Sequence, residues 1–142
     1  MDWTGKGRLL LTSVAALTAV GGFLADWNRT HLFNPDWPPH ARFHDAQTIA
    51  LGSLLGACGL YFLRRRGKDP QTDLTLGALL PSLFWVAQGA SFAFSGAEGV
   101  EAEFPEMVPR VKGVWVNERF ISALMLALIA AGYGAERRRR GA

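Results

Sequence analysis

All three histidines of this 142-residue chain lie within one segment, residues 26–45, which reads DWNRTHLFNPDWPPHARFHD. The same segment holds three aspartates, two asparagines and two tryptophans. Imidazoles and carboxylates are the side chains that transfer protons near neutral pH, and imidazoles also bind metal ions. The segment therefore points to acid–base chemistry or to a metal site.

Metal binding is an alternative that the histidine spacing keeps open. The three prolines of the segment fix their φ angles, so the connection is stiff. Pro39 suits the first turn of a helix, which places His40 and His44 one turn apart on the same face. With His31 as a third ligand, this spacing is compatible with a metal ion. The chain has no HExxH motif and no cysteine pair, so the motif itself is weak.

If the protein is an enzyme, its residues favour proton transfer, as in an isomerase or a hydrolase. Carboxylates and imidazoles at the mouth of an apolar helix bundle have shifted pKa values and can exchange protons with a lipophilic substrate. We expect His44, with Asp26 or Glu118, to act as acid and base. A polar network that only joins the loop to the helix ends is the simpler alternative. The predicted substrate-binding residues are His31, Asn34, Trp37, His40, Trp85, Gln88 and Asn117.

The elements that position these residues are four apolar segments with few charges. The chain is 49% hydrophobic and only 19% charged, and most of its charge lies between the segments. Each segment is near the length needed to cross about 30 Å of hydrocarbon as a helix. This pattern excludes a disordered chain, a disulfide scaffold and an ordinary soluble domain. We predict an all-α, up-down bundle of four transmembrane helices in one integral membrane domain, residues 1–142, with spans at about 9–25, 46–63, 74–97 and 114–135.

The distribution of basic residues predicts the orientation of the bundle. Ten of the fifteen lysines and arginines precede the first span, follow the second or follow the fourth. The positive-inside rule then places both termini in the cytoplasm and the histidine-rich loop outside, across the cell membrane if the protein is bacterial. We interpret the basic runs as topology signals with anionic-lipid contacts, so no nucleic-acid partner is expected.

Small residues occur on every span and predict close helix packing. Gly52 and Gly56 have the GxxxG spacing that lets two backbones approach closely, either within the bundle or between two copies of the chain. Pro81 should kink the third span. Trp85 and Gln88 lie on one face of that span, where they form an interhelical hydrogen bond and fill space, or form the floor of a ligand pocket.

The run DWNRTHLFNPDWPPHARFHDAQT, residues 26–48, resembles a signature of small, uncharacterised four-helix membrane proteins of bacteria and fungi. Members of that family carry a THxxNPxWPPHAxFH segment after the first span. The resemblance implies the four-span layout but brings no established reaction. A looser similarity in architecture alone links the chain to the sterol-isomerase and sigma-2-receptor group. The residues that match the signature are Thr30, His31, Asn34, Pro35, Trp37, His40, Phe43 and His44.

Together these features predict a small polytopic membrane protein that binds a lipophilic small molecule or lipid near the outer membrane face. Acid–base activity at the His/Asp/Glu site is part of this hypothesis, although the sequence leaves open whether the protein is catalytic. A non-catalytic accessory subunit of a larger membrane complex is the first alternative, and a metal-binding membrane protein is the second. The cofactor is left open, and the partners that we expect are the lipid bilayer, a lipophilic small molecule, and a homodimer or larger membrane complex.

Overall fold

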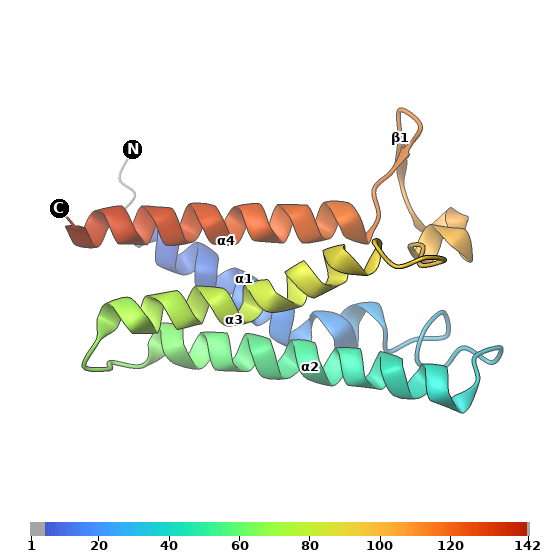
Figure 1. The fold of residues 1–142 in the computed structure, drawn as a ribbon, viewed down its shortest axis with the longest axis horizontal. Coiled ribbons are helices and arrows are strands. Elements are labelled where there is room, and N and C mark those ends of the chain that lie inside the picture. The colour runs from blue at the N-terminus through green and yellow to red at the C-terminus, as the bar shows by residue number, and fades with distance from the viewer. Residues whose placement is uncertain (1–4, 142) are drawn as a thin grey trace.

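The computed structural model describes residues 5–141 and consists mainly of four long helices in an up-down arrangement (Figure 1). Because successive helices alternate in direction, α1 begins and α4 ends at the same end of the bundle. The all-α, four-helix fold predicted from the sequence is confirmed. The helices are α1 (Lys6–Ala25), α2 (Pro39–Arg64), α3 (Pro70–Ser91) and α4 (Glu118–Gly141).

Local sequence explains most of the helix boundaries. Pro39 begins α2, seven residues before the predicted start of the second span, because its ring suits the first helical position. Asp69 caps α3, since its Oδ1 accepts hydrogen bonds from the backbone N–H groups of Gln71 at 3.0 Å and Thr72 at 3.1 Å. The C-terminal end of α3, at Ser91, comes six residues before the end of the predicted third span.

The fourth span is predicted to start at about residue 114, but the chain forms a small hairpin there and α4 begins at Glu118. Strand β1 (Arg110–Val111) pairs antiparallel with β2 (Val114–Trp115). Between them, Lys112 and Gly113 both have positive φ angles, which make the two-residue turn. Two short 3₁₀ helices, η1 (Val100–Ala102) and η2 (Pro105–Met107), precede the hairpin.

All four helices are long and apolar enough to cross a membrane, and the exposed surface fits that environment. Large apolar side chains point away from the bundle on every helix, as with Leu24, which is 75% exposed, and Leu54, which is 63% exposed. In a soluble bundle such surfaces would be polar. The structure therefore fits an integral membrane protein. The cytoplasmic placement of the termini stays a prediction.

Small residues bring the helices together inside the bundle. A Cβ on Gly56 of α2 would come within 2.6 Å of the Ala15 backbone oxygen of α1. A Cβ on Gly7 would come within 2.7 Å of the Gly132 backbone oxygen of α4. These contacts leave no room for a side chain, so the GxxxG glycine Gly56 serves packing between α1 and α2.

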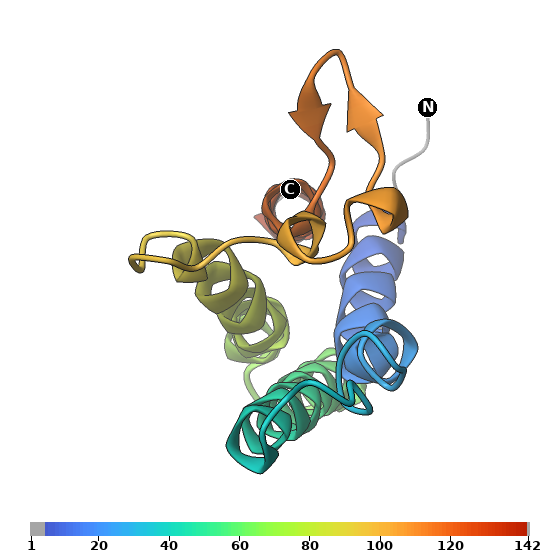
Figure 2. The same cartoon turned by 90° about the vertical axis from the view of Figure 1, so that its right-hand side faces the viewer.

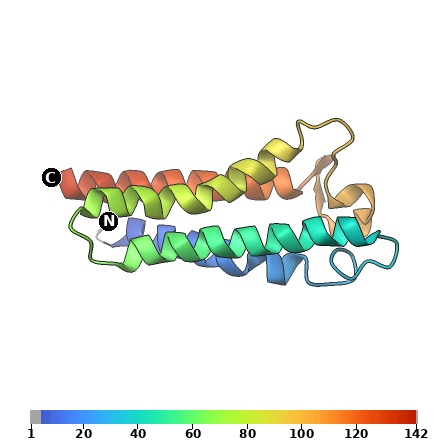
Figure 3. The same ribbon diagram turned by 60° about the horizontal axis from the view of Figure 1, so that its bottom comes forward.

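Pro81 lies inside α3, and the helix bends away from α2 past its middle (Figures 1 and 3). The bend separates the helices at the end of the bundle where α1 and α3 terminate. Seen from that end, residues 92–117 cross from α3 over α4 towards α1 (Figure 2). We call this the loop end, and the opposite end, which carries Arg8, Arg64–Arg66 and Arg137–Arg140, the arginine end.

Candidate functional site

A cavity of about 410 Å³ opens at the loop end of the bundle. Its walls are formed by α1, α3, the first turns of α4, and the segments around residues 30 and 108. Apolar side chains make up most of the lining, among them Leu17, Phe84, Val108 and Ile121. The polar side chains that line the cavity are Thr18, Asp26, Thr30, His31, Gln88, Asn117 and Glu118.

Asp26 and His31 are brought together where α1 ends and the chain turns. Asp26 is the first residue after α1, and its Oδ1 lies 3.8 Å from His31 Nε2. Burial raises the pKa of Asp26 to about 6, with smaller contributions from the nearby carboxylates of Asp45 and Glu118, whereas His31 opposes the rise. Asp26 is therefore a group that both holds and releases a proton close to neutral pH.

His31 is held in place from its other side. Its Nδ1 lies 2.9 Å from Thr30 Oγ1, and its ring meets the indole of Trp37 edge-on, with 5.8 Å between ring centres. The Thr30 hydroxyl in turn donates to Asn28 Oδ1 at 2.6 Å. These contacts orient the imidazole so that Nε2 is the nitrogen facing Asp26.

Glu118, at the start of α4, has one satisfied and one unsatisfied oxygen. Its Oε1 accepts a hydrogen bond from the Val100 backbone N–H at 3.0 Å. Within residues 5–141, the buried Oε2 accepts no hydrogen bond. A buried acceptor without a donor is unfavourable by about 1–3 kcal/mol, so Glu118 Oε2 is a position at which a ligand's donor would be stabilised.

Glu101 is a neighbouring carboxylate that sequence reasoning missed. Its Oε2 and Glu118 Oε2 both lie within 2.5 Å of the place where a Cβ would stand on Gly99, so the two carboxylate oxygens converge on the space beside this glycine. Asn117 Nδ2 donates to Glu101 Oε1 at 2.5 Å. Glu101 is one of several glutamates in a polar loop, and nothing in its local sequence separates it from the others.

The floor of the cavity combines the two alternatives proposed for Trp85 and Gln88. Trp85 Nε1 donates to Thr18 Oγ1 on α1 at 2.9 Å, and Gln88 Nε2 donates to Ser122 Oγ on α4 at 3.2 Å. Both residues also line the cavity. These interhelical hydrogen bonds therefore fix the polar groups that a ligand would contact at the deep end of the cavity.

Two of the predicted binding residues support the site from outside the cavity. Trp37 lines an adjoining hollow of about 400 Å³ that shares His31 and Glu118 with the cavity. Asn34 is buried and orders the loop, because its Nδ2 donates to the Thr30 backbone oxygen at 3.3 Å and its Oδ1 accepts from the Asp36 backbone N–H at 3.0 Å. The role of Asn34 in the structure is thus to shape the loop that carries His31.

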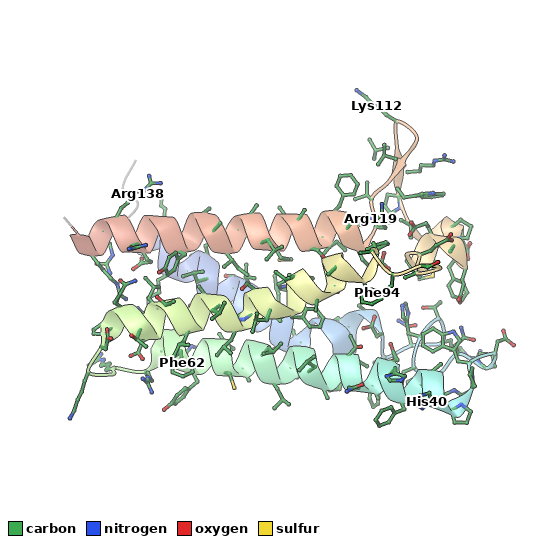
Figure 4. All side chains as sticks on the ribbon, viewed as in Figure 1. His40, Phe62, Phe94, Lys112, Arg119 and Arg138 are labelled. Atoms are coloured by element: carbon green, nitrogen blue, oxygen red, sulfur yellow. The ribbon has the colours of Figure 1, made fainter. Side chains whose placement is uncertain are left out.

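His40 and His44 lie apart from these groups. They share a face of α2 as predicted, with their Nε2 atoms 3.1 Å apart, but both are exposed and neither lines the cavity. Figure 4 labels His40 near the start of α2. Across residues 5–141, no three side chains of histidine, cysteine, aspartate or glutamate are grouped closely enough to hold a metal ion. The predicted residues that meet at the cavity are Asp26, His31, Trp85, Gln88, Asn117 and Glu118.

Comparison with known proteins places this chain in one family. Residues 10–142 match the family model described as Family of unknown function (DUF6640). The chain belongs to this family. No curated protein and no solved structure matches it. The match supports the expectation of an uncharacterised family, but confirms neither the loop signature nor the similarity to the sterol-isomerase group.

Proposed function

We propose that the cavity of this DUF6640 protein binds a lipophilic small molecule or lipid through one polar group. The observation that carries the proposal is the buried, unpartnered Oε2 of Glu118 in a mainly apolar cavity between apolar helices. A cavity of about 410 Å³ has the size of small-molecule sites, which combine apolar walls with a few polar groups.

The chemistry of the polar groups specifies which part of the ligand they bind. Glu118 Oε2 is an acceptor in need of a donor, and Asp26 is a second carboxyl group on the same cavity. A hydroxyl group or a protonated amine supplies such a donor, whereas a carboxylate would be repelled. We therefore propose an alcohol or an amine on an apolar body as the ligand class.

Acid–base activity is the catalytic form of this proposal. Asp26, with its raised pKa, would donate a proton to one atom of the substrate, while the Glu118 carboxylate would accept a proton from another. His31, 3.8 Å from Asp26, would return the proton between the carboxyl groups, directly or through one water molecule. An isomerisation that moves a double bond needs only these transfers, and no oxidant or reductant.

Binding of matched probes to the purified full chain in detergent tests the proposal. Oleyl alcohol, oleylamine and oleate share one apolar tail and differ in the polar group. We expect the alcohol and the amine to bind and to change tryptophan fluorescence through Trp85, and oleate to bind at least tenfold more weakly, because one unfavourable charge contact in a buried site exceeds about 1.4 kcal/mol. Equal binding of all three probes would show that the carboxylates do not select the ligand.

Substitutions separate the site from general effects on the bundle. Glu118→Gln should weaken amine binding, whereas Glu106→Gln, which removes the same charge from an exposed residue of the segment that precedes α4, should not. Gly21 lines the cavity, and a Cβ there would meet nothing within 4 Å, so Gly21→Leu should fill the cavity without displacing a helix. An accessory subunit would instead keep its partner proteins with Gly21→Leu and lose them with Trp37→Ala.

A further inference from the structure

A second hollow, of about 220 Å³, lies at the arginine end of the bundle, far from the cavity along the helices. Four arginines from three parts of the chain line it. Arg8 comes from the first turn of α1, Arg65 and Arg66 from the connection between α2 and α3, and Arg140 from the end of α4. The fold therefore gathers arginines that are distant in sequence around one opening.

The carboxylates near this hollow do not balance its charge. Asp73 is the one acidic residue among the side chains described as lining it, and its Oδ1 is taken by Arg65 Nε at 2.6 Å. Glu136 Oε2 forms ion pairs with Arg139 Nη2 at 3.1 Å and with Arg140 Nε at 4.0 Å. Arg66 forms no hydrogen bond or ion pair with any residue in the range 5–141. A net positive charge is left around the opening.

Hydrogen bonds to the backbone orient two of the arginines. Arg8 Nη2 donates to the Leu63 backbone oxygen, and Arg140 Nη1 donates to the Pro70 backbone oxygen at 2.6 Å. A guanidinium group has five N–H donors, so each of these arginines keeps donors for a ligand. The first amides of α3 are already capped by Asp69, which leaves the arginines as the groups able to bind an anion.

We propose that this hollow binds a phosphate group, as carried by an anionic phospholipid headgroup or a free phosphate. Guanidinium groups match phosphate oxygens with paired hydrogen bonds, and basic pockets between transmembrane helices are known to hold lipid headgroups. Phe62, Leu63 and Leu74 line the same hollow, next to the level where α2 leaves the apolar span. This apolar wall is suited to the glycerol and first methylene groups of a lipid.

The test compares the full chain in phosphatidylcholine nanodiscs with and without phosphatidylglycerol, with retained lipid counted by native mass spectrometry. Arg66→Gln is the test variant, because removing its unpartnered side chain leaves the internal contacts intact. Arg138→Gln is the matched control: it removes the same charge from an exposed residue at the same end, on the face of α4 away from α2 and α3 (Figure 4). Inorganic phosphate added to phosphatidylcholine nanodiscs is the second arm.

We expect the wild-type chain to retain phosphatidylglycerol over phosphatidylcholine, and Arg66→Gln to bind it about fivefold more weakly, as expected for one arginine near an anionic headgroup. Arg138→Gln should bind as the wild type does. Binding of inorganic phosphate that is also lost in Arg66→Gln would identify free phosphate as a ligand, and its absence would identify the lipid. Equal loss in both variants, or no preference for either anion in the wild type, would overturn the proposal.

Discussion

The two ends of the bundle differ in whether their buried carboxylates have hydrogen-bond donors. At the arginine end, Asp73 is 4% exposed and Glu136 is 1% exposed, and both accept hydrogen bonds from arginines and from backbone N–H groups. At the loop end, Glu101 and Glu118 each bury one oxygen without a donor. The same residue types therefore stabilise one end and leave binding capacity at the other.

The physical reason lies in the cost of burying a charge. Burial of a carboxylate is favourable only when nearby charges and hydrogen-bond donors replace its hydration. The arginine end supplies these from its own chain, and the helices close there around Gly7 and Gly132. At the loop end the bend of α3 at Pro81 leaves space where such donors would stand. A ligand with a donor group would complete the loop end as arginine completes the other.

Substitution of Asp73 should have the largest effect on stability. Asp73→Asn removes the charge that pairs with Arg65 at 2.6 Å in a buried position. Because Arg65 itself is 38% exposed, the loss is that of a hydrogen bond to a charged group, and the free energy of unfolding should fall by about 1.5–3 kcal/mol. Thermal unfolding of the purified protein in detergent measures this loss. A loss below about 1 kcal/mol would mean that the pair acts as a solvent-screened surface contact.

The same substitution at the loop end is the matched comparison. Asp26→Asn removes a carboxylate that faces His31 at 3.8 Å and whose pKa burial raises to about 6. We expect unchanged or increased stability near neutral pH, because the ionised form is the one that burial disfavours. A loss as large as that of Asp73→Asn would contradict the contrast between the two ends.

Alanine substitution of two glycines should give the next largest effect on the free energy of unfolding. Gly56→Ala places a Cβ against the α1 backbone at Ala15 and should lower the free energy of unfolding by about 1–3 kcal/mol, as overpacking does. Gly21→Ala meets open space and should raise it by about 0.5–1 kcal/mol, through the higher helix propensity of alanine. Thermal unfolding of both variants under the same conditions measures whether each substitution raises or lowers the free energy of unfolding. Destabilisation by Gly21→Ala would show that the loop end packs more closely than the cavity implies.

Stability should also fall as the pH rises through the titration of Asp26. Its pKa is about 6 in the folded chain, above the ordinary value of 3.8, so the folded state binds the proton more tightly than the unfolded state. Between these two values the unfolded chain holds fewer protons, and the free energy of unfolding decreases with increasing pH. Comparison of pH profiles for the wild type and Asp26→Asn isolates this contribution. Parallel profiles would show that Asp26 titrates normally.

The fold was predictable from the sequence because lipid imposes strong constraints. Long apolar segments must become helices, and proline fixes both the start of α2 at Pro39 and the bend of α3 at Pro81. The hairpin was not predictable in the same way, since residues 114–116 form a short apolar run just before the fourth apolar segment, and their pairing with residues 110–111 is not visible in the sequence. Apolar composition indicates burial or membrane contact, but it does not say which backbone partner a residue finds.

The site was predictable only in part, because residues close in sequence need not share a cavity. Asp26 and Glu118 were each predicted as the acid–base partner of His44, and both line the cavity with His31. Glu101 was missed because its carboxylate lies near that of Glu118 beside Gly99, a tertiary arrangement that no local motif indicates. His44 was grouped with Asp26 since both belong to one dense loop, but helical geometry turns His44 towards His40 on an exposed face.

The smallest effect is expected from that exposed pair. The double variant His40→Ala/His44→Ala removes two imidazole rings. These rings contact each other and the neighbouring side chains of Phe43 and Gln47, and neither ring lines the cavity. The free energy of unfolding should change by less than about 0.5 kcal/mol, as for other surface positions. Oleylamine binding should be unchanged, whereas His31→Ala should weaken it, because only His31 faces Asp26. Loss of oleylamine binding in the double variant would show that His40 and His44, and not the cavity residues, form the functional site. A stoichiometric metal in the wild type that this variant lacks would show the same.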